Sequence, residues 1–464
     1  MSLDAAPAIA ANRFGLGARP GDLDHIRPDP RGWLSAQLSG PAPLLSGSEL
    51  KRSAEVLQQG AELTRERRGL RAQNGAPSPE QIAALLRLPQ LYRPIYQAEV
   101  GARMRNAVAT QRPFVERLVY FWSNHFAVSV DKIAVFGVAG SLEREAIRPH
   151  MMGNFRQLLL AVEQHPAMLL YLDNQRSTGP NSLAAQRAAR QERTLGLNEN
   201  LAREILELHT LGVDGGYTQS DVTSFAKVLT GWSIGRGGAR EEGAAGEFLF
   251  RPALHEPGAQ VVVGRRYGQS DLAQGEAVLT DLATSPATAR HIATKLARHF
   301  IADDPPPRAV AQIAQVFVRS GGDLPRVYQA VIECREAWET PQAKFKTPHD
   351  YVLSVYRGLA LSVPERSDAV VPFQILGQRT FAPGSPAGWP DRSADWDGAS
   401  SLMKRIEYAD ALSQRLPTTI SAADLAPQLL GATYTDETRT SLKRAATAAQ
   451  AMTLLLTSPE FLRR

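Results

Sequence analysis

The stretch NENLAREILELHTLG, residues 198–212, has the periodicity of an amphipathic helix. At about 100° per residue, its apolar side chains share an arc of roughly 120°, which is the expected core-facing stripe of Leu197, Leu201, Ile205, Leu208 and Leu211. Glu204 falls inside this arc, and His209 lies at its edge. Because a carboxylate taken out of water without a partner is costly, Glu204 must meet a cation, a metal or a donor network, or stay protonated. The pattern therefore predicts that this helix forms one wall of a polar site.

Helical periodicity recurs along the rest of the chain. Residues 113–126 present one apolar face, formed by Phe114, Leu118, Phe121, Trp122 and His125. Thr218, followed three residues later by Asp221, has the capping-box pattern of a helix start. Ser285 and Pro286 begin another helix, whose apolar side carries Ile292, Leu296 and Phe300. The sequence therefore predicts a mainly α, compact multi-helix fold.

One short segment has the alternation of a strand. Phe248 and Phe250 alternate with their neighbours, and three valines follow at 261–263 after Pro257 and Gly258. This pattern predicts one small β-hairpin near residues 247–264, with His255 close to its turn. An isolated hairpin is marginally stable, so the surrounding helices must support it.

We interpret residues 1–464 as a single domain. Its helical core runs from about residue 100 to 360, and helical segments 1–57 and 361–464 flank it. Stretches rich in charge, glycine or proline predict loop insertions at 58–81, 176–196 and 235–246. Because residues 176–196 run directly into the 198–212 helix, we consider them a candidate lid.

Composition excludes several classes of protein. Hydrophobic residues make up 43% of the 464 residues and charged residues 21%, as in ordinary folded proteins. The net charge is +5, but 44 of the 52 basic residues are arginines scattered along the chain, so we expect no nucleic-acid partner. The lone cysteine, Cys334, allows neither an internal disulfide nor a thiolate cluster. No apolar run is long enough to cross a bilayer and no export leader is evident, so we expect a soluble, cytoplasmic chain.

Three histidines are candidates for a functional site. His125 follows Asn124 on the apolar face of its helix, where a core histidine bonded to a carbonyl and a carboxylate is the simpler interpretation, and a ligand or general base is the alternative. The same holds for His209, which can also interact with the helix dipole near Gly212. A hairpin turn could deliver His255 toward the helical wall, although histidines in loops are often merely solvated.

Glu204 is the candidate acid or base of this site. A structural ion pair with Arg203, Lys132, Lys295 or Lys346 is an equally reasonable interpretation. In a catalytic site, Arg203 or Lys346 would contact an anion. Arg203 is also four residues from both Glu199 and Glu207, and such pairs usually support a helix.

A divalent metal is a further alternative. If His125, His209 and His255 converged with Glu204 or Glu207, the set would suit Zn²⁺, Fe²⁺ or Mn²⁺. The usual helical signatures, His-Glu-x-x-His and Glu-x-x-His, are absent. On a regular helix, Glu207 and His209 project about 160° apart, and Glu204 and His209 about 140° apart, so these pairs are awkward ligands.

Other chemistries have less support in the sequence. The glycine-rich stretches lack the lysine and spacing of phosphate-binding loops, and no Gly-x-Ser-x-Gly elbow is present. In the loop GWPD at 388–391, Trp389 could stack a sugar or an aromatic ligand together with Trp396, although such loops more often cover the edge of a core.

Seven segments together resemble one bacterial family, the domain of unknown function 1800. They are RFGLGARPGD (13–22), FWSNHF (121–126), NENLAREILELHTLGVDGGYTQSDV (198–222), LTGW (229–232), KFKTPHDYV (344–352), GQRTFAPGSPAGWPD (377–391) and TSPEFLRR (457–464). The resemblance implies no settled activity and no established catalytic residues. It also implies that many relatives are exported, and that their genes often accompany a family resembling alkaline phosphatases and sulfatases.

Two functions are consistent with these patterns. The first is an enzyme with a buried Glu/His/Arg pocket that performs a hydrolytic or redox step on a small or sugar-like substrate, with metal assistance as a variant. In it, Glu204, His125, His209 and His255 would be the catalytic or metal-binding residues, and Arg203, Lys346, Asn124 and Trp389 would bind the substrate. The second is a non-catalytic scaffold or accessory protein for a phosphatase- or sulfatase-like partner. A cavity lined by titratable groups favours the enzyme, and a packed polar network without a void favours the scaffold.

Overall fold

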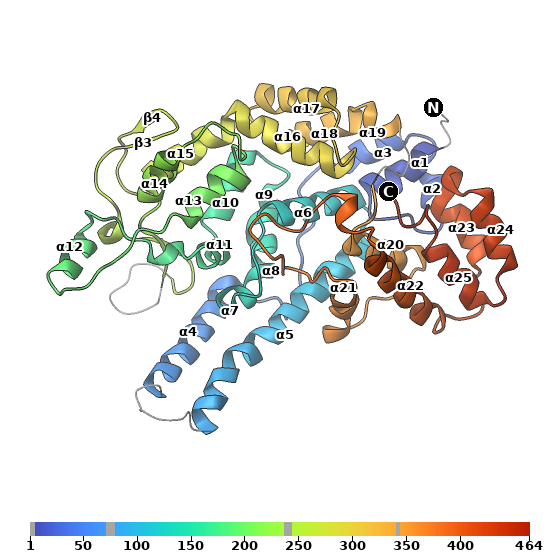
Figure 1. The fold of residues 1–464 in the computed structure, drawn as a ribbon, viewed down its shortest axis with the longest axis horizontal. Coiled ribbons are helices and arrows are strands. Elements are labelled where there is room, and N and C mark those ends of the chain that lie inside the picture. Colours follow the sequence, from blue (N-terminus) through green and yellow to red (C-terminus); the bar gives the residue numbers. More distant parts are fainter. Residues whose placement is uncertain (1–4, 71–78, 236–243, 340–343) are drawn as a thin grey trace.

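The computed structural model describes residues 5–70, 79–235, 244–339 and 344–464. The fold is mainly α, as the sequence predicts, with short strands confined to residues 232–267 among the described residues (Figure 1). Helices α16, α17 and α18 lie along one edge, and the C-terminal helices α22 to α25 form one end. None of the described helices combines the length and the apolar character that a membrane span requires.

The elements up to residue 228 are helical. In chain order they are α1 (Ala6–Ile9), the π-helical η2 (Ala10–Phe14), α2 (Asp22–Ile26), α3 (Pro30–Ala36), α4 (Ser53–Leu70), α5 (Pro79–Ala109), α6 (Pro113–His125), α7 (Ile133–Phe136), α8 (Ala139–Leu142), the π-helical η3 (Glu143–Ile147), α9 (Arg148–His150), α10 (Phe155–Glu163), α11 (Pro166–Tyr171), the 3-10 helix η4 (Asn174–Arg176), α12 (Leu183–Ala189), α13 (Asn200–Glu204), the π-helical η5 (Ile205–His209) and α14 (Gln219–Val228).

The remaining elements include the strands. They are β1 (Trp232–Ile234), β2 (Phe248–Phe250), the 3-10 helix η6 (Pro252–Leu254), β3 (Gln260–Val262), β4 (Arg265–Tyr267), α15 (Leu272–Thr284), α16 (Pro286–Phe300), α17 (Pro307–Ser320), α18 (Leu324–Glu333), α19 (Glu336–Glu339), α20 (Pro348–Gly358), the 3-10 helix η7 (Arg366–Ala369), α21 (Val371–Ile375), the 3-10 helix η8 (Ser393–Asp395), α22 (Ala399–Ser413), α23 (Ala422–Leu430), the 3-10 helix η9 (Gly431–Thr433), α24 (Asp436–Arg444) and α25 (Ala448–Leu456).

An aromatic cluster joins distant parts of the chain in the core. Phe14 of η2 packs against Phe114 of α6, Phe300 of α16 and Trp338 of α19, with ring centroids 5.2–5.7 Å apart. All four side chains are buried. Since burying one large apolar side chain contributes about 1.5–3 kcal/mol, this cluster fixes α6 and α16 against each other.

The helix starts expected from the sequence are confirmed. Thr218 and Asp221 form a complete capping box at α14, and the hydroxyl of Ser285 accepts a hydrogen bond from the main chain of Ala287 at the start of α16. The apolar face expected on residues 113–126 becomes the buried face of α6. Local capping and periodicity suffice for these helices because both signals lie within one element.

The 198–212 segment is helical but not regular. The α-helical turns of α13 end at Glu204, and η5 continues as a π-helix to His209. A π-helix rotates successive side chains by less than an α-helix does, so the angles expected for Glu204, Glu207 and His209 do not apply here. Glu204 is half-buried, and partial burial raises the pKa of its carboxyl.

The strand prediction is wrong in its pairing. β2 pairs antiparallel with β1, and β3 pairs with β4, so two hairpins replace the single one expected near 247–264. The turn between β3 and β4 consists of Val263 and Gly264, which both have positive φ, of 48° and 72°. A two-residue turn of this kind pairs the two strands that it connects, β3 and β4. β2 therefore pairs with β1 instead of with β3.

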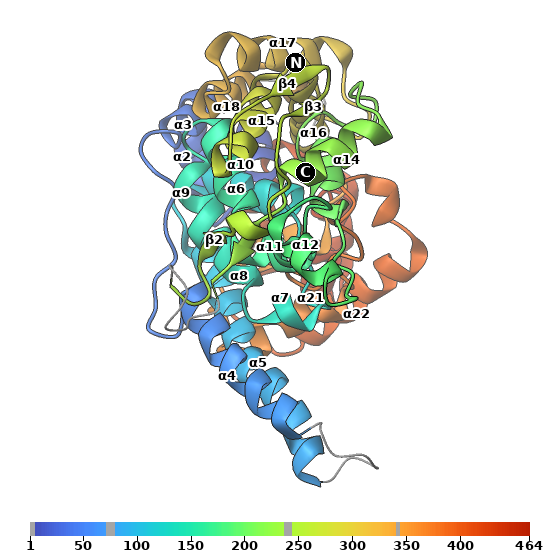
Figure 2. The same ribbon diagram turned by 90° about the vertical axis from the view of Figure 1, so that its left-hand side faces the viewer.

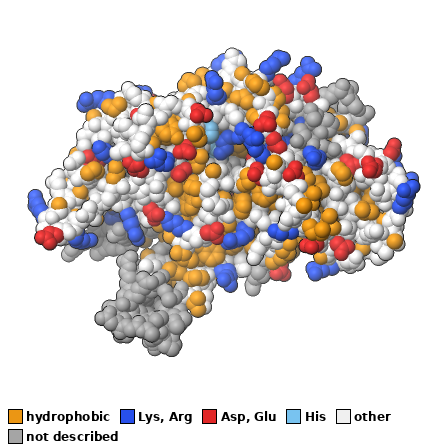
Figure 3. Space-filling view, in the orientation of Figure 1, with side chains coloured by type: hydrophobic (Ala, Val, Ile, Leu, Met, Phe, Trp, Pro, Cys, Tyr) orange, Lys and Arg blue, Asp and Glu red, His pale blue; other side chains and the backbone are white. Residues whose placement is uncertain are grey.

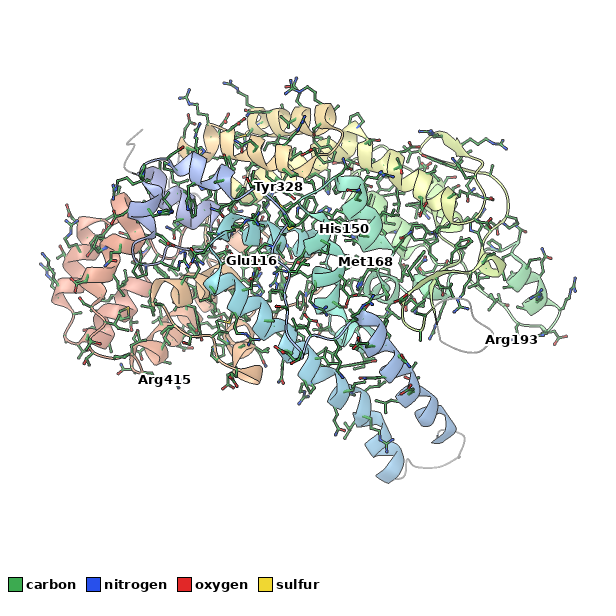
Figure 4. The ribbon with its side chains drawn as sticks, turned by 180° about the vertical axis from the view of Figure 1, so that it is seen from behind. Glu116, His150, Met168, Arg193, Tyr328 and Arg415 are labelled. Carbon is green, nitrogen blue, oxygen red and sulfur yellow. The ribbon has the colours of Figure 1, made fainter. Side chains whose placement is uncertain are left out.

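The expected insertions differ in their structure. Residues 53–70, which overlap the insertion expected at 58–81, form α4, which lies beside α5 in a helical pair projecting from the body (Figure 2). Residues 71–78 and 236–243 lie outside the described residues. The 176–196 segment contains α12, and its Arg193 lies at the far edge of the molecule from Glu116 (Figure 4).

Candidate functional site

The candidate site is a cavity of about 410 Å³ between α6, α16, α20 and the loop 378–396. Its volume lies in the lower part of the range for small-molecule sites. The side chains that surround it include arginine, lysine, histidine, aspartate and glutamate residues from segments almost 300 residues apart in sequence. Packing of α6 against α16 through the aromatic cluster holds two of its walls in place.

One wall is the polar face of α16. His291, Lys295, Arg298 and His299 line the cavity, while Ile292, Leu296 and Phe300 on the opposite side of the helix are buried in the core. A spacing of three and four residues puts the four polar side chains on one face. The space-filling view shows lysine and arginine side chains gathered beside a histidine between α16 and α6 (Figure 3).

Lys295 is the cation of this wall that lacks a partner. It is half-buried, and it forms neither a hydrogen bond nor an ion pair with any described residue. Burial lowers the pKa of its ammonium to about 8, Asp391 opposes this effect, and Arg298 adds to it. The side chain is therefore still mostly charged at neutral pH.

His299 and Asp391 form an imidazole–carboxylate pair at the same wall. Nδ1 of His299 lies 2.9 Å from Oδ2 of Asp391, and Nε2 is buried without a hydrogen-bond partner in the described chain. Burial lowers the pKa of His299 to about 4, although Asp391 opposes it, so the neutral ring donates its Nδ1 proton. Burial acts to raise the pKa of Asp391, but His299, Lys344 and Arg464 hold it well below its usual range.

Asp350, near the start of α20, is shared by two buried guanidinium groups. Nη1 of Arg117 lies 2.9 Å from Oδ1, and Nε of Arg464 lies 2.9 Å from Oδ2. Burial acts to raise the pKa of Asp350, but the two arginines outweigh it and hold the pKa far below its usual range. Asp350 also completes the capping box of α20 with Thr347. This one carboxylate therefore connects the start of α20 to Arg117 of α6 and to Arg464.

A second buried charge network lies on the other side of the cavity. Arg148 binds Glu116 and Glu143 at 2.5 Å and 2.8 Å, and Arg103 binds Glu143 at 2.6 Å. Ser123 donates a hydrogen bond of 2.7 Å to Glu143. Figure 4 shows Glu116 near the middle of the molecule. Every carboxylate here has a cation, so this network supplies a fixed charged wall.

Asn124 connects α6 to the loop that closes the cavity. Its Nδ2 donates to the carbonyl oxygen of Trp389 at 2.8 Å, and its Oδ1 accepts from the main-chain nitrogen of Trp389 at 2.7 Å. Gly388 has φ of 84°, and a Cβ there would lie 2.3 Å from the carbonyl oxygen of Asn124. The close approach of loop and helix therefore requires glycine at this position.

The cavity contains four histidines with lowered pKa values. Burial lowers the pKa of His291 to about 4, and the positive charge of Lys295 lowers it further. Burial lowers the pKa of His349 to about 3, and Arg103 adds to this effect. The pKa of His125 is also well below its usual value, chiefly through burial. Since His299 behaves in the same way, the four rings are neutral at pH 7 and contribute no positive charge.

Three of the eight residues proposed from the sequence line this cavity, namely His125, Asn124 and Trp389. Nε2 of His125 donates to the carbonyl oxygen of His209, and its Nδ1 is buried without a partner among the described residues. Trp389 is half-buried against Trp396, with ring centroids 6.1 Å apart.

The other five proposed residues lie outside the cavity lining. Nδ1 of His209 pairs with buried Glu163 at 2.8 Å, and Nδ1 of His255 lies 3.0 Å from the carbonyl oxygen of Thr230. Arg203 pairs with Glu199, as expected for helix support.

Glu204 and Lys346 make no ion pair with each other. Glu204 has no ion pair with any described residue, and Lys346 is buried with its ammonium 4.4 Å from the ring of Phe461. Burial lowers the pKa of Lys346 to about 7. Of the 198–212 segment, only Leu208 reaches the cavity, so the polar wall expected there is supplied by α16.

The proposed metal ligands do not form a metal site. His125 and His209 are neighbours, with ring centroids 6.0 Å apart, but the described ranges contain no group of three His, Cys, Asp or Glu side chains placed to hold a metal ion. The reason is that His209 is committed to Glu163 and His255 to the main chain of Thr230.

Sequence reasoning missed Arg298, His299 and Asp391, and it considered Lys295 only as an ion-pair partner of Glu204, a pair that the described residues do not form. One signal was present, because His291, Lys295 and His299 recur every four residues on a helix whose apolar face the sequence already defines. The partner Asp391 is 92 residues from His299, and no local pattern connects the two.

Several of the segments that carry the family resemblance meet at the cavity. Residues 121–126, 344–352 and 377–391 all contribute lining side chains, and Arg464 of the 457–464 segment binds Asp350. Gly15 in the 13–22 segment accepts a hydrogen bond from Nε of Arg117, which also binds Asp350. Five of the seven segments thus contribute to the cavity or to its buried ion pairs, whereas residues 229–232 do not line it and 198–222 contribute only Leu208.

Fold and site together define a mainly helical protein built around a charged internal cavity. The family model "Protein of unknown function (DUF1800)" matches residues 9–463, and the chain belongs to this family. No curated protein and no solved structure matches the chain.

Proposed function

We propose that the chain is an enzyme and that the cavity between α6, α16 and α20 binds its small anionic substrate. The observation that carries this proposal is the presence, on one face of α16, of an unpaired ammonium and a carboxylate-bound imidazole, Lys295 and His299. Because the two residues are four apart, their side chains are neighbours on the helix surface. An anion held at Lys295 would therefore place its adjoining atoms beside His299.

The charge balance of the cavity supports anion binding at Lys295. Of the four carboxylates that line the cavity, Glu143 is paired with Arg103, Asp350 with Arg117, and Asp391 with Lys344. The fourth, Asp395, is exposed to solvent and forms no ion pair with a described side chain of α16. Lys295 is left without a counter-charge among the described side chains, in a site partly shielded from water. Such a position attracts an anion more strongly than an exposed lysine does.

The His299–Asp391 pair supports proton transfer. Nδ1–H of His299 donates a hydrogen bond to the Asp391 carboxylate, so the lone pair of the neutral ring is at Nε2. A buried nitrogen without a partner costs about 1–3 kcal/mol, which a hydrogen bond from a substrate hydroxyl or water would offset. An anion at Lys295 would raise the pKa of the ring and strengthen it as a base. Taking a proton from water is the step that hydrolysis requires, and we therefore favour a hydrolytic reaction.

We assign the base to His299 rather than to Glu204, because Glu204 lies outside the lining of the cavity. The alternative function, a scaffold for a phosphatase- or sulfatase-like partner, requires a packed polar network without a void. The cavity of about 410 Å³ favours the enzyme. The interaction with a phosphatase- or sulfatase-like partner stays a prediction.

Sulfate is a suitable probe of the binding part, because it does not titrate near neutral pH. We expect calorimetry at constant ionic strength and pH 7 to show sulfate binding that Lys295→Met weakens at least about tenfold, since a charged hydrogen bond contributes about 1.5–3 kcal/mol. Lys132→Met is the matched control, because Lys132 pairs with Asp173 at 2.6 Å and does not line the cavity. Equal sulfate affinity in the wild type and Lys295→Met would refute the proposal.

The same proteins test the catalytic part. His299→Asn keeps Lys295 and should bind sulfate like the wild type. Hydrolysis of p-nitrophenyl phosphate, sulfate and acetate esters is the readout, and loss of a general base should lower the rate about 10²- to 10⁴-fold. A hydrolytic rate that His299→Asn leaves unchanged would exclude His299 as the base.

A further inference from the structure

We infer that the anion bound in this cavity carries two negative charges, which Lys295 and Arg298 share. The inference rests on the proposed function, and it narrows the substrate class to small dianions. A phosphate or sulfate group and a short dicarboxylate have this chemistry in common.

Arg298 lies on the same face of α16 as Lys295, three residues further along, and both line the cavity. Side chains three apart on a helix are neighbours, and the positive charge of Arg298 acts on both Lys295 and His291. The two cations therefore face the same volume.

Neither of these cations has an acidic partner in the described part of the chain. Arg298 forms no ion pair there, and its Nε donates at 3.2 Å to a main-chain oxygen, that of Asp303. A carbonyl oxygen carries no formal charge, so this contact leaves the guanidinium charge uncompensated. Asp391 attracts Lys295, but it is already bound to His299 and Lys344. Two adjacent cations without carboxylates favour a ligand with two charges over a ligand with one.

The hydrogen bond to Asp303 also orients Arg298. Because Nε is held, the fork of the two terminal nitrogens is fixed in direction, and these nitrogens have no partner among the described residues. A planar guanidinium fork matches the paired oxygens of a carboxylate, phosphate or sulfate group, while Lys295 acts as a point charge beside it. The guanidinium group of Arg298 and the ammonium group of Lys295 could therefore bind the same small molecule.

The other groups at this wall add no positive charge. His291 and His299 are neutral at pH 7, and the lining arginines Arg103 and Arg117 are bound to buried carboxylates. Arg392 is exposed to solvent and pairs with Asp304 at 3.2 Å. The two positive charges available to a ligand are therefore those of Lys295 and Arg298, and the volume of about 410 Å³ limits the ligand to a small molecule.

Sulfate and methyl sulfate provide a matched test, because they share a tetrahedral headgroup and differ by one charge. Titration calorimetry at pH 7 and constant ionic strength should show that the wild type binds sulfate at least about tenfold more tightly than methyl sulfate. Arg298→Gln should lower the affinity for sulfate about tenfold and remove this preference, while methyl sulfate binding changes little. Arg298→Lys keeps the charge and should retain the preference. Arg290→Gln, an exposed arginine on the same helix, is the control and should have no effect.

Malonate distinguishes the two sources of the dianion. Tighter binding of malonate than of sulfate would assign a dicarboxylate, and the reverse would assign a tetrahedral oxyanion; both results support the inference. Equal affinities for sulfate and methyl sulfate, both dependent on Lys295, would overturn the dianion and leave the anion site standing. Binding of none of these anions by the folded wild type would overturn the anion site itself, and the inference with it.

Discussion

Replacing Asp350 by Asn is expected to lower the free energy of unfolding by about 3–5 kcal/mol, the usual cost of removing one partner from a buried charge network. The amide preserves the shape of the side chain but leaves Arg117 and Arg464 without the carboxylate that each contacts at 2.9 Å. Both arginine side chains are 2% exposed or less, so water cannot replace the lost charge. Denaturant-induced unfolding, followed by circular dichroism, measures the change.

A matched control separates burial from chemistry. Asp24→Asn breaks an ion pair with Arg27 in which the Asp24 side chain is 84% exposed. Exposed pairs contribute little, so this variant should lose less than about 1 kcal/mol. Similar losses for Asp350→Asn and Asp24→Asn would show that the Asp350 network is open to water, contrary to the site described above.

Acidification from pH 6.5 to 4.5 is expected to reduce stability by several kcal/mol. His125, His291, His299 and His349 have lowered pKa values in the folded state, whereas an unfolded histidine titrates near about 6.5. The unfolded chain therefore binds protons in this window that the folded chain does not. The stability that the neutral rings contribute is complete above pH 6.5 and is lost as the pH falls toward 4. Each of the rings whose pKa is lowered to about 4 or below, His291, His299 and His349, accounts for about 2 kcal/mol at pH 4.5.

The carboxylates extend the effect to lower pH. Asp350 and Asp391 have pKa values held below their usual range, so their contribution is present above about pH 4 and disappears below it. His349→Gln should reduce the slope of unfolding free energy against pH by one proton, and His25→Gln, an exposed histidine, should leave it unchanged. A free energy of unfolding that stays constant from pH 6.5 to 4.5 would contradict the burial of these rings.

The sequence was most informative where one element contains its own signal. The capping boxes and apolar faces predict α6, α14 and α16 because the relevant side chains are at most four residues apart. The π-helical turn at Ile205–His209 has no such signal, because the apolar spacing of a short segment is compatible with either helix type. The predicted strand pairing was wrong for a similar reason. The sequence did not show that the two-residue turn at Val263 and Gly264 would pair β3 with β4, instead of the longer connection from β2 pairing β2 with β3.

The site was only partly predictable. His125 and Asn124 stood out as polar residues at the end of an aromatic helix, and both line the cavity. The wall that we propose to bind an anion was missed because its residues look like the solvated face of an amphipathic helix. What makes that face the wall of a cavity is the loop carrying Trp389 and Asp391, which contacts α6 and α16 from another part of the chain. Tertiary contact, not local pattern, turns a polar face into a cavity.

The dependence of sulfate binding on pH between 7 and 10 tests the central claim most directly. In this window Asp391 stays ionised, and His125, His291 and His299 stay neutral, so Lys295 is the group near the anion that titrates. We predict that the dissociation constant is nearly constant up to about pH 8 and then rises tenfold per pH unit, as the ammonium loses its proton. A dissociation constant that stays flat to pH 10, or one that Lys295→Met does not change, would contradict the account.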